Sequence, residues 1–191
     1  MRKVLSAVLL AGVLVLSQAC GGDSGVTKEE AGQVFSAAAG AAGQVQGQVF
    51  SGMAQAPAAD QVTVGDYTYE WTDNSFAFTG TVNSAEGGSA SVEGAGTWDK
   101  ATQAASFDFS LSFNAFAAQG ILLDGVLEMS FSGSQQVYEL SYSGDIEASG
   151  KVVGSITFDL TVKMGNGSIE YSGTVGGQKI GGSANYNIPS H

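Results

Sequence analysis

Six carboxylate side chains after Gln61 are the residues of this chain best suited to acid–base chemistry. They are Glu70, Asp108, Glu128, Glu139, Asp159 and Glu170. A glycosidase needs only two carboxyl groups at the right separation. All six, however, alternate with apolar residues, and Ser, Thr, Asp and Glu are the ordinary composition of a solvated sheet face. The pattern therefore indicates that these carboxylates are in contact with water, and we expect no enzyme activity.

Nucleophilic and metal-dependent chemistry lacks its usual residues. The only histidine is His191, the last residue, and the only cysteine is Cys20. A Ser-His-Asp or Cys-His site would need the C-terminal tail to swing in, and a zinc site built from His and Cys is excluded on the same ground. No glycine motif of the phosphate-binding type leads from a strand into a helix. We therefore expect no cofactor and no metal.

The charge balance is strongly acidic. The 191 residues include 18 Asp and Glu but only 7 Lys and Arg, which gives a formal net charge of −11. Binding to nucleic acid needs clustered Lys and Arg that neutralise phosphates, and no such cluster is present. The sequence therefore predicts a soluble, monomeric domain that does not bind nucleic acid.

The N-terminus has the pattern of an export signal. A basic start, Arg2-Lys3, precedes the apolar run 4–16, which is too short to span a membrane. The run is followed by Ser17-Gln18-Ala19-Cys20. Ser17-Gln18-Ala19 also fits the small-x-small site of ordinary signal cleavage, so that alternative stays open. Residues 1–19 are therefore predicted to be a signal peptide.

This segment resembles the signal of bacterial lipoproteins. In that family the cysteine after a small residue is diacylated, with chains such as palmitate, and becomes the first residue of the mature protein. Ala19 and Cys20 match, whereas Ser17 departs from the pattern because the usual leucine stands one place early, at Leu16. A residue other than Asp after the cysteine, here Gly21, implies sorting to the outer membrane. The resemblance implies a lipid anchor at Cys20, a flexible tether over 20–26, and a position on the periplasmic or cell-surface side.

The segment 27–56 is predicted to be a helix rich in Ala and Gly. Thr27 and Glu30 have the spacing of a capping box, and apolar residues follow at helical intervals. Its glycines each weaken the helix by about 1 kcal/mol relative to alanine, so it needs a surface to dock on. The alternative is a partly disordered, low-complexity tether.

After residue 60 the chain alternates apolar and polar residues, as in Phe107-Asp108-Phe109. This alternation predicts about nine strands between 61 and 189. The expected strands are 61–72, 74–84, 88–99, 103–114, 121–133, 136–148, 150–164, 167–176 and 179–189. The links are short turn sequences such as Asn166-Gly167, which only join neighbouring antiparallel strands. Two interruptions are interpreted as a bulge at Gly65-Asp66 and as a loop over 114–123 that folds over something.

Glycine recurs on the apolar face of these strands. Examples are Gly80, Gly94, Gly96, Gly144 and Gly173. Glycine weakens a strand, so it is expected where a sheet bends or where another element approaches closely. The fold class predicted from these observations is mainly β. It is an antiparallel up-and-down meander that forms a strongly curled sheet or barrel, with the Ala/Gly helix packed on or in it.

Three functions remain open at this stage. The first is an exported, lipid-anchored protein with a structural or interaction role, whose apolar face is filled core. The second is a carrier that binds a hydrophobic ligand or lipid on its concave face. The residues that would line that ligand site are Phe107, Phe109, Leu111, Phe131, Tyr142, Phe158 and Tyr171. The third is a membrane-spanning barrel with its apolar face toward lipid, which an odd strand number and the helix disfavour.

Overall fold

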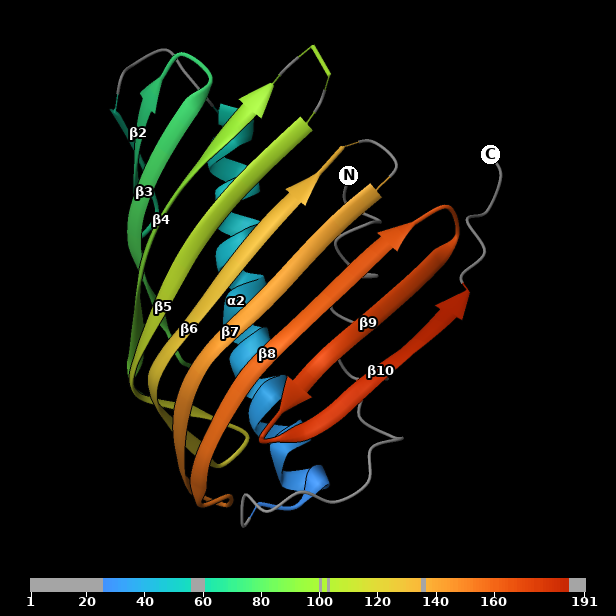
Figure 1. Cartoon of the computed structure of the whole chain (residues 1–191). Coiled ribbons are helices and arrows are strands. Elements are labelled where there is room, and N and C mark those ends of the chain that lie inside the picture. The colour runs from blue at the N-terminus through green and yellow to red at the C-terminus, as the bar shows by residue number, and fades with distance from the viewer. Residues whose placement is uncertain (1–25, 56–60, 100, 103, 135–136, 186–191) are drawn as a thin grey trace.

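The computed structural model describes residues 26–55, 61–99, 101–102, 104–134 and 137–185. They form one helix, α2 (Lys28–Gln55), followed by ten strands that pair antiparallel in sequence order in a single sheet (Figure 1). The strands are β1 (Gln61–Val64), β2 (Tyr67–Thr72), β3 (Ser75–Asn83), β4 (Ser89–Asp99), β5 (Ala104–Ala118), β6 (Ile121–Gly133), β7 (Val137–Gly150), β8 (Gly154–Gly165), β9 (Ser168–Val175) and β10 (Gln178–Asn185). The predicted meander is confirmed.

The sheet contains one strand more than the sequence predicted. The segment 61–72 is a hairpin of β1 and β2, in which Val64 pairs with Tyr67 across Gly65-Asp66. Gly65 has a positive φ of 60°, a conformation that glycine adopts without steric cost. The predicted bulge at Gly65-Asp66 is therefore wrong: the shift of phase there marks a reversal of chain direction.

The sheet is neither closed nor strongly curled, which corrects the prediction of a strongly curled sheet or barrel. A barrel requires its first and last strands to pair. Within the described residues β1 pairs with β2 and β10 pairs with β9, and the two lie at opposite ends of the sheet (Figure 1). The helix α2 lies across the concave side of the sheet (Figure 1).

The helix begins at the predicted capping box. The Thr27 N–H and hydroxyl donate to Glu30 Oε2 at 2.8 and 2.7 Å, and the Glu30 N–H donates to Thr27 Oγ1 at 3.3 Å. Val34, Ala38 and Val45 are fully buried between the helix and the sheet. The alternative of a disordered tether is therefore wrong for 28–55, and the small side chains of the helix let it lie close to the sheet.

The segment 114–123 continues two strands and is not a loop, so that prediction is wrong. A bulge between Phe113 and Phe116 shifts the register of β5 against β6, and the chain then turns tightly at Gln119-Gly120. Beyond the bulge, Phe116 and Ile121 are buried in the core. The bulge bends the end of this hairpin over the core, which is why its sequence departs from the alternation of the other strands.

Glu86, in the β3–β4 loop, ties the tip of that hairpin to the sheet. Its carboxylate accepts hydrogen bonds from the N–H groups of Gln119 (3.0 Å) and Gly120 (3.1 Å). Beside it, the Ser84 hydroxyl donates to the Ala117 carbonyl, and the Ala117 N–H donates to the Gly87 carbonyl at 2.9 Å. The hydrogen bonds from Gln119 and Gly120 lower the pKa of Glu86, because N–H donors favour the charged carboxylate.

Removing this carboxylate is expected to destabilise the protein in a pH-dependent way. The folded pKa of Glu86 lies below the ordinary value of 4.5. Its stabilising contribution is therefore present above the unfolded pKa and disappears as pH falls through the folded pKa. Glu86→Ala should lower Tm at neutral pH, and the Tm difference from wild type should shrink in acid. Glu93→Ala, at an exposed carboxylate in the middle of β4, is the control with little effect at either pH. A difference for Glu86→Ala that stays constant with pH would contradict this account.

The glycines on the apolar face have two structural roles. Gly144 and Gly173 have positive φ values of 142° and 144°, and a Cβ there would overlap carbonyl oxygens of the neighbouring strands, those of Val126 and Asp159. At Gly94 an added Cβ would lie 2.6 Å from the Asp108 carbonyl oxygen on β5 and also 2.6 Å from the ring of Phe78. Glycine thus permits close backbone approach at all three positions and, at Gly94, also makes room for an aromatic ring.

Candidate functional site

The seven residues predicted to line a ligand site all lie on the side of the sheet that carries the core. Six of them, Phe107, Phe109, Leu111, Phe131, Tyr142 and Phe158, are buried, and they come from β5, β6, β7 and β8. Tyr171, on β9, is only partly buried and packs at the margin of the same cluster. The structure therefore brings the predicted residues together and places Tyr171 at their edge.

The helix contributes the side chains that cover these residues. The Phe35 ring, 3% exposed, lies 5.7 Å from the Tyr142 ring in an edge-to-face arrangement and 5.8 Å from the Phe158 ring. Farther along the helix, the Tyr69 hydroxyl donates to the Gln48 carbonyl at 2.9 Å. Where Phe35 packs, the aromatic side chains of the concave face contact the helix, so that part of the apolar face is filled core.

Two amide side chains among the described residues are buried, Gln46 and Gln178. Gln46, on α2, is 6% exposed, and its Nε2 lies 3.4 Å from the Met129 sulfur on β6. A thioether is a weak acceptor, so this contact partly satisfies the buried amide. It is a second polar link between the helix and the sheet, and sequence reasoning missed it because Gln46 stands within a helical run of small residues.

The buried phenols cannot act as acids or bases near neutral pH. Burial raises the pKa of Tyr142 to about 12. Burial raises the pKa of Tyr69 to about 12 as well, with a smaller contribution from Tyr67. Desolvation disfavours the phenolate, so these hydroxyls stay protonated. The Tyr69 hydroxyl serves as a hydrogen-bond donor, and both rings serve as packing surface.

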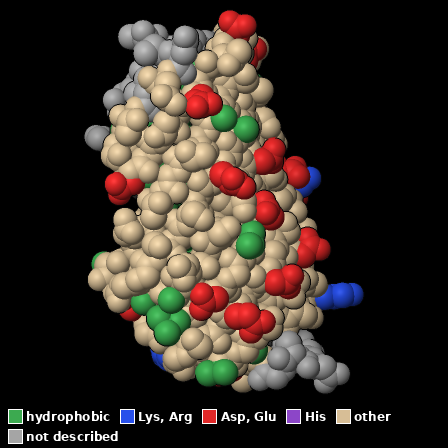
Figure 2. Space-filling view, turned by 90° about the vertical axis from the view of Figure 1, so that its left-hand side faces the viewer, with side chains coloured by type: hydrophobic (Ala, Val, Ile, Leu, Met, Phe, Trp, Pro, Cys, Tyr) green, Lys and Arg blue, Asp and Glu red, His purple; other side chains and the backbone are tan. Residues whose placement is uncertain are grey.

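The six predicted carboxylates lie on the opposite, convex face. Figure 2 shows that Asp and Glu are scattered over the molecular surface seen there, with few Lys or Arg among them. No two of the six are directly opposite each other in the strand register. In the part of the chain that the structure describes, no group of three or more His, Cys, Asp or Glu could hold a metal ion. This arrangement gives the convex face an acidic surface.

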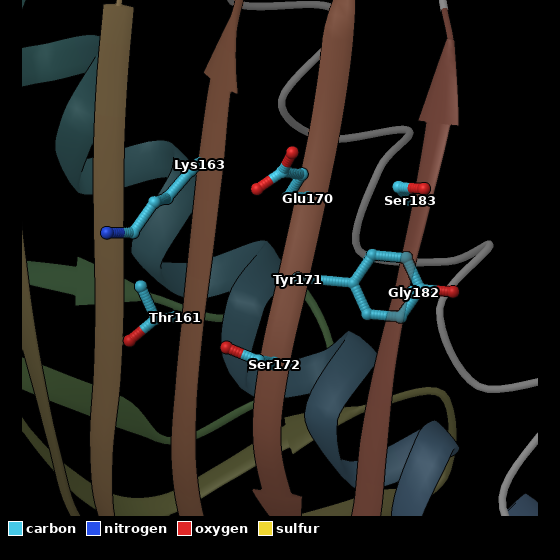
Figure 3. Close-up of a pocket in the computed structure, with 7 residues that line it drawn as sticks. All are labelled: Thr161, Lys163, Glu170, Tyr171, Ser172, Gly182 and Ser183. Atoms are coloured by element: carbon cyan, nitrogen blue, oxygen red, sulfur yellow. The ribbon is translucent and has the colours of Figure 1, made fainter.

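One hollow, which we name the β8–β10 hollow, lies where the last three strands meet the edge of the sheet (Figure 3). It has a volume of about 370 Å³. It is lined by Thr161, Lys163, Glu170, Tyr171, Ser172, Gly182 and Ser183. Short Ser, Thr and Gly residues form much of its lining, and the longer, charged side chains of Lys163 and Glu170 also line it. Most of the residues that line it carry polar or charged side chains. The sequence pointed only to Glu170 and Tyr171, because the other residues are ordinary for a solvated strand.

The predicted lipidation residue Cys20 and the predicted signal peptide 1–19 lie outside the described residues, as does His191. The described fold begins at Val26, at the end of the predicted tether. None of the helices that the structure describes has both the length and the apolar character needed to cross a membrane.

Comparison of the chain with protein-family models, with curated proteins and with solved structures finds no match.

Proposed function

We propose that this chain is an exported lipoprotein, anchored at the outer membrane through Cys20, with a structural or interaction role and no catalytic activity. The observation that carries the role is the position of α2, whose Phe35 ring packs on Tyr142 and Phe158. With those residues used as core, the surface left for a partner is the polar, acidic convex face and the sheet edges. The anchor is supported by the sequence pattern, in which the only cysteine follows a short apolar run and a small residue.

The carrier alternative was suggested by an open apolar concave face, and part of that face is covered by Phe35 of α2. An acyl chain would need an apolar cavity beside the concave aromatic residues. Two of those residues, Tyr142 and Phe158, pack against Phe35 of α2, and the β8–β10 hollow is lined mainly by residues with polar side chains. Native mass spectrometry of the protein purified from cells tests this point. We expect a mass without bound lipid, whereas a stoichiometric lipid would favour the carrier.

The anchor is tested by membrane fractionation. Wild-type protein should stay with the membrane after a carbonate wash, and mass spectrometry should find an acylated N-terminal cysteine. Cys20→Ser should move the protein to the soluble fraction with an unchanged circular dichroism spectrum and Tm, because Cys20 precedes the described fold. Ser24→Ala, in the same tether, is the matched control and should stay with the membrane. If the Cys20→Ser protein remains membrane-bound after the wash, the anchor is not at Cys20.

A further inference from the structure

The outer edge of β10 is an eight-residue strand that, within the described residues, pairs only with β9. The opposite edge, β1, has only four residues. An edge strand exposes backbone N–H and C=O groups that can pair with another extended chain. Proteins often protect such edges with a lysine, and β10 carries Lys179. The β10 edge therefore combines backbone groups that can pair with another strand and a lysine that can either protect the edge or bind an acidic partner.

The β8–β10 hollow lies directly beside this edge, and it contains a carboxylate without a cation. Lys163 is opposite Glu170 in the strand register, but its ammonium nitrogen lies 3.1 Å from Glu139 Oε2 on the other side (Figure 3). The structure gives Glu170 no ion pair among the described residues. On its other side Glu170 is opposite Ser183 of β10. Only this short side chain separates the carboxylate from the edge of the sheet.

We propose that β10 pairs antiparallel with β10 of a second copy of this chain, with Gly181 opposite Gly181, to form a symmetric dimer. In this register Lys179 of each copy stands opposite Ser183 of the other, on the convex face. A lysine side chain in that place extends over Ser183 into the hollow and reaches the Glu170 carboxylate. The two-fold axis repeats the ion pair, so one interface contains two Lys179–Glu170 contacts.

The register follows from the geometry of antiparallel pairing. Residues directly opposite each other point to the same face, and Lys179, Gly181 and Ser183 share the convex face with Thr174, Ser172 and Glu170 of β9. A two-fold axis through the pairing must therefore pass at a residue. Passing it at Gly181 pairs most of β10 and brings Lys179 to Ser183, whereas passing it at Gly182 places Lys179 at Asn185, the last residue of the strand.

The composition of β10 suits a copy of itself. Gly181 presents no side chain at the axis, and on the concave face the same register sets Ile180 opposite Gly182, so a large side chain meets a small one. A chain with 7 basic and 18 acidic residues has few cations to offer, and it places one of them at this edge. The contact area of one strand pair is small, so the dimer is expected to be weak and to depend on protein concentration. The monomer expected from the sequence is the dissociated form.

Disulfide trapping tests both the pairing and its register. The full chain carries Cys20→Ser, so that the introduced cysteine is the only thiol. Gly181→Cys should give a covalent dimer under mild oxidation, because the two Cα atoms face each other at the axis within the range of about 4.4–6.8 Å that a disulfide spans. The site accepts a side chain, since an added Cβ lies 3.6 Å from the nearest atom, the Tyr171 carbonyl oxygen. Ser183→Cys is the matched control: its two copies lie ~13 Å apart along the strands and should not cross-link.

Charge exchange tests the ion pair independently. Sedimentation of the Cys20→Ser chain should show a monomer–dimer equilibrium that Lys179→Glu and Glu170→Lys each weaken at least about tenfold, as expected for a charge reversal that replaces attraction by repulsion twice per dimer. The double variant Lys179→Glu/Glu170→Lys should recover most of the affinity. A circular dichroism spectrum like that of wild type shows that each variant is folded.

Three results would overturn the proposal. A chain that remains monomeric at the highest soluble concentration excludes the second copy as the occupant of the edge. Cross-linking at Ser183→Cys but not at Gly181→Cys excludes this register. Species that grow beyond a dimer indicate head-to-tail pairing of β10 with β1. None of these results bears on acylation of Cys20, which is tested by fractionation.

Discussion

Replacing Phe35 with alanine is expected to lower the free energy of unfolding by about 3–5 kcal/mol, as measured by urea denaturation. The Phe35 ring is 3% exposed and packs between α2 and the rings of Tyr142 and Phe158. Its removal leaves a cavity between helix and sheet, where the backbones on both sides are held by regular hydrogen bonding and cannot collapse fully. The expected effect is therefore that of a core residue, although the glycine content of α2 predicts a helix that is only marginally stable by itself.

The matched control on the same helix should have the opposite sign. An added Cβ at Gly40 meets no atom within 4 Å, so Gly40→Ala should raise the free energy of unfolding by about 0.5–1 kcal/mol through helix propensity. Urea unfolding of both variants, followed by tryptophan fluorescence and by circular dichroism, measures the pair. A loss below about 1 kcal/mol for Phe35→Ala would mean that α2 is not docked firmly. The concave aromatic residues would then be open to a ligand, and the carrier alternative would regain its support.

The sequence predicted the strands well because one face of the sheet packs in the core and the other face is in contact with water. Apolar and polar residues alternate without interruption over 127–132, and the structure assigns the predicted strand 121–133 to β6 with the same bounds. The predictions of a bulge at Gly65-Asp66 and of a loop over 114–123 were wrong, because alternation shows which face of a strand is buried but not in which direction the chain runs. A tight reversal and a bulge both shift the phase, and only the pairing of Val64 with Tyr67 tells them apart.

The candidate site shows a different limit. Alternation placed Phe107 and Phe158 on the apolar face, but the same side chains serve equally to hold a ligand or to pack on a helix. What distinguishes the two is the position of Phe35, which depends on how α2 crosses the sheet. The β8–β10 hollow depends on the register of β9 with β10, which alternation alone does not give. The two-residue turn Gly176-Gly177, with positive φ at both glycines, sets that register and places Glu170 opposite Ser183.

A single methyl group at Gly173 is expected to cost as much stability as the loss of a core side chain. Gly173 has a φ of 144°, which L-residues with a side chain rarely adopt, and its added Cβ would overlap the Asp159 carbonyl oxygen on β8. Strain in such a conformation costs about 1–3 kcal/mol and overpacking about the same again. Gly173→Ala should therefore lower the free energy of unfolding by about 2–5 kcal/mol, measured by urea denaturation.

The control lies on the next strand. Gly181 is not in the left-handed region, and an added Cβ there is in ordinary contact, 3.6 Å from the Tyr171 carbonyl oxygen. Gly181→Ala, measured at a protein concentration at which the chain is monomeric, should change the free energy of unfolding by less than about 0.5 kcal/mol, as for a surface position without a special conformation. Equal effects of the two substitutions would show that β8 and β9 do not approach as closely at Gly173 as the structure indicates. A larger loss of stability for Gly173→Ala than for Gly181→Ala would show that the backbone of the sheet requires glycine at position 173. The two variants carry the same chemical change, so only the position differs.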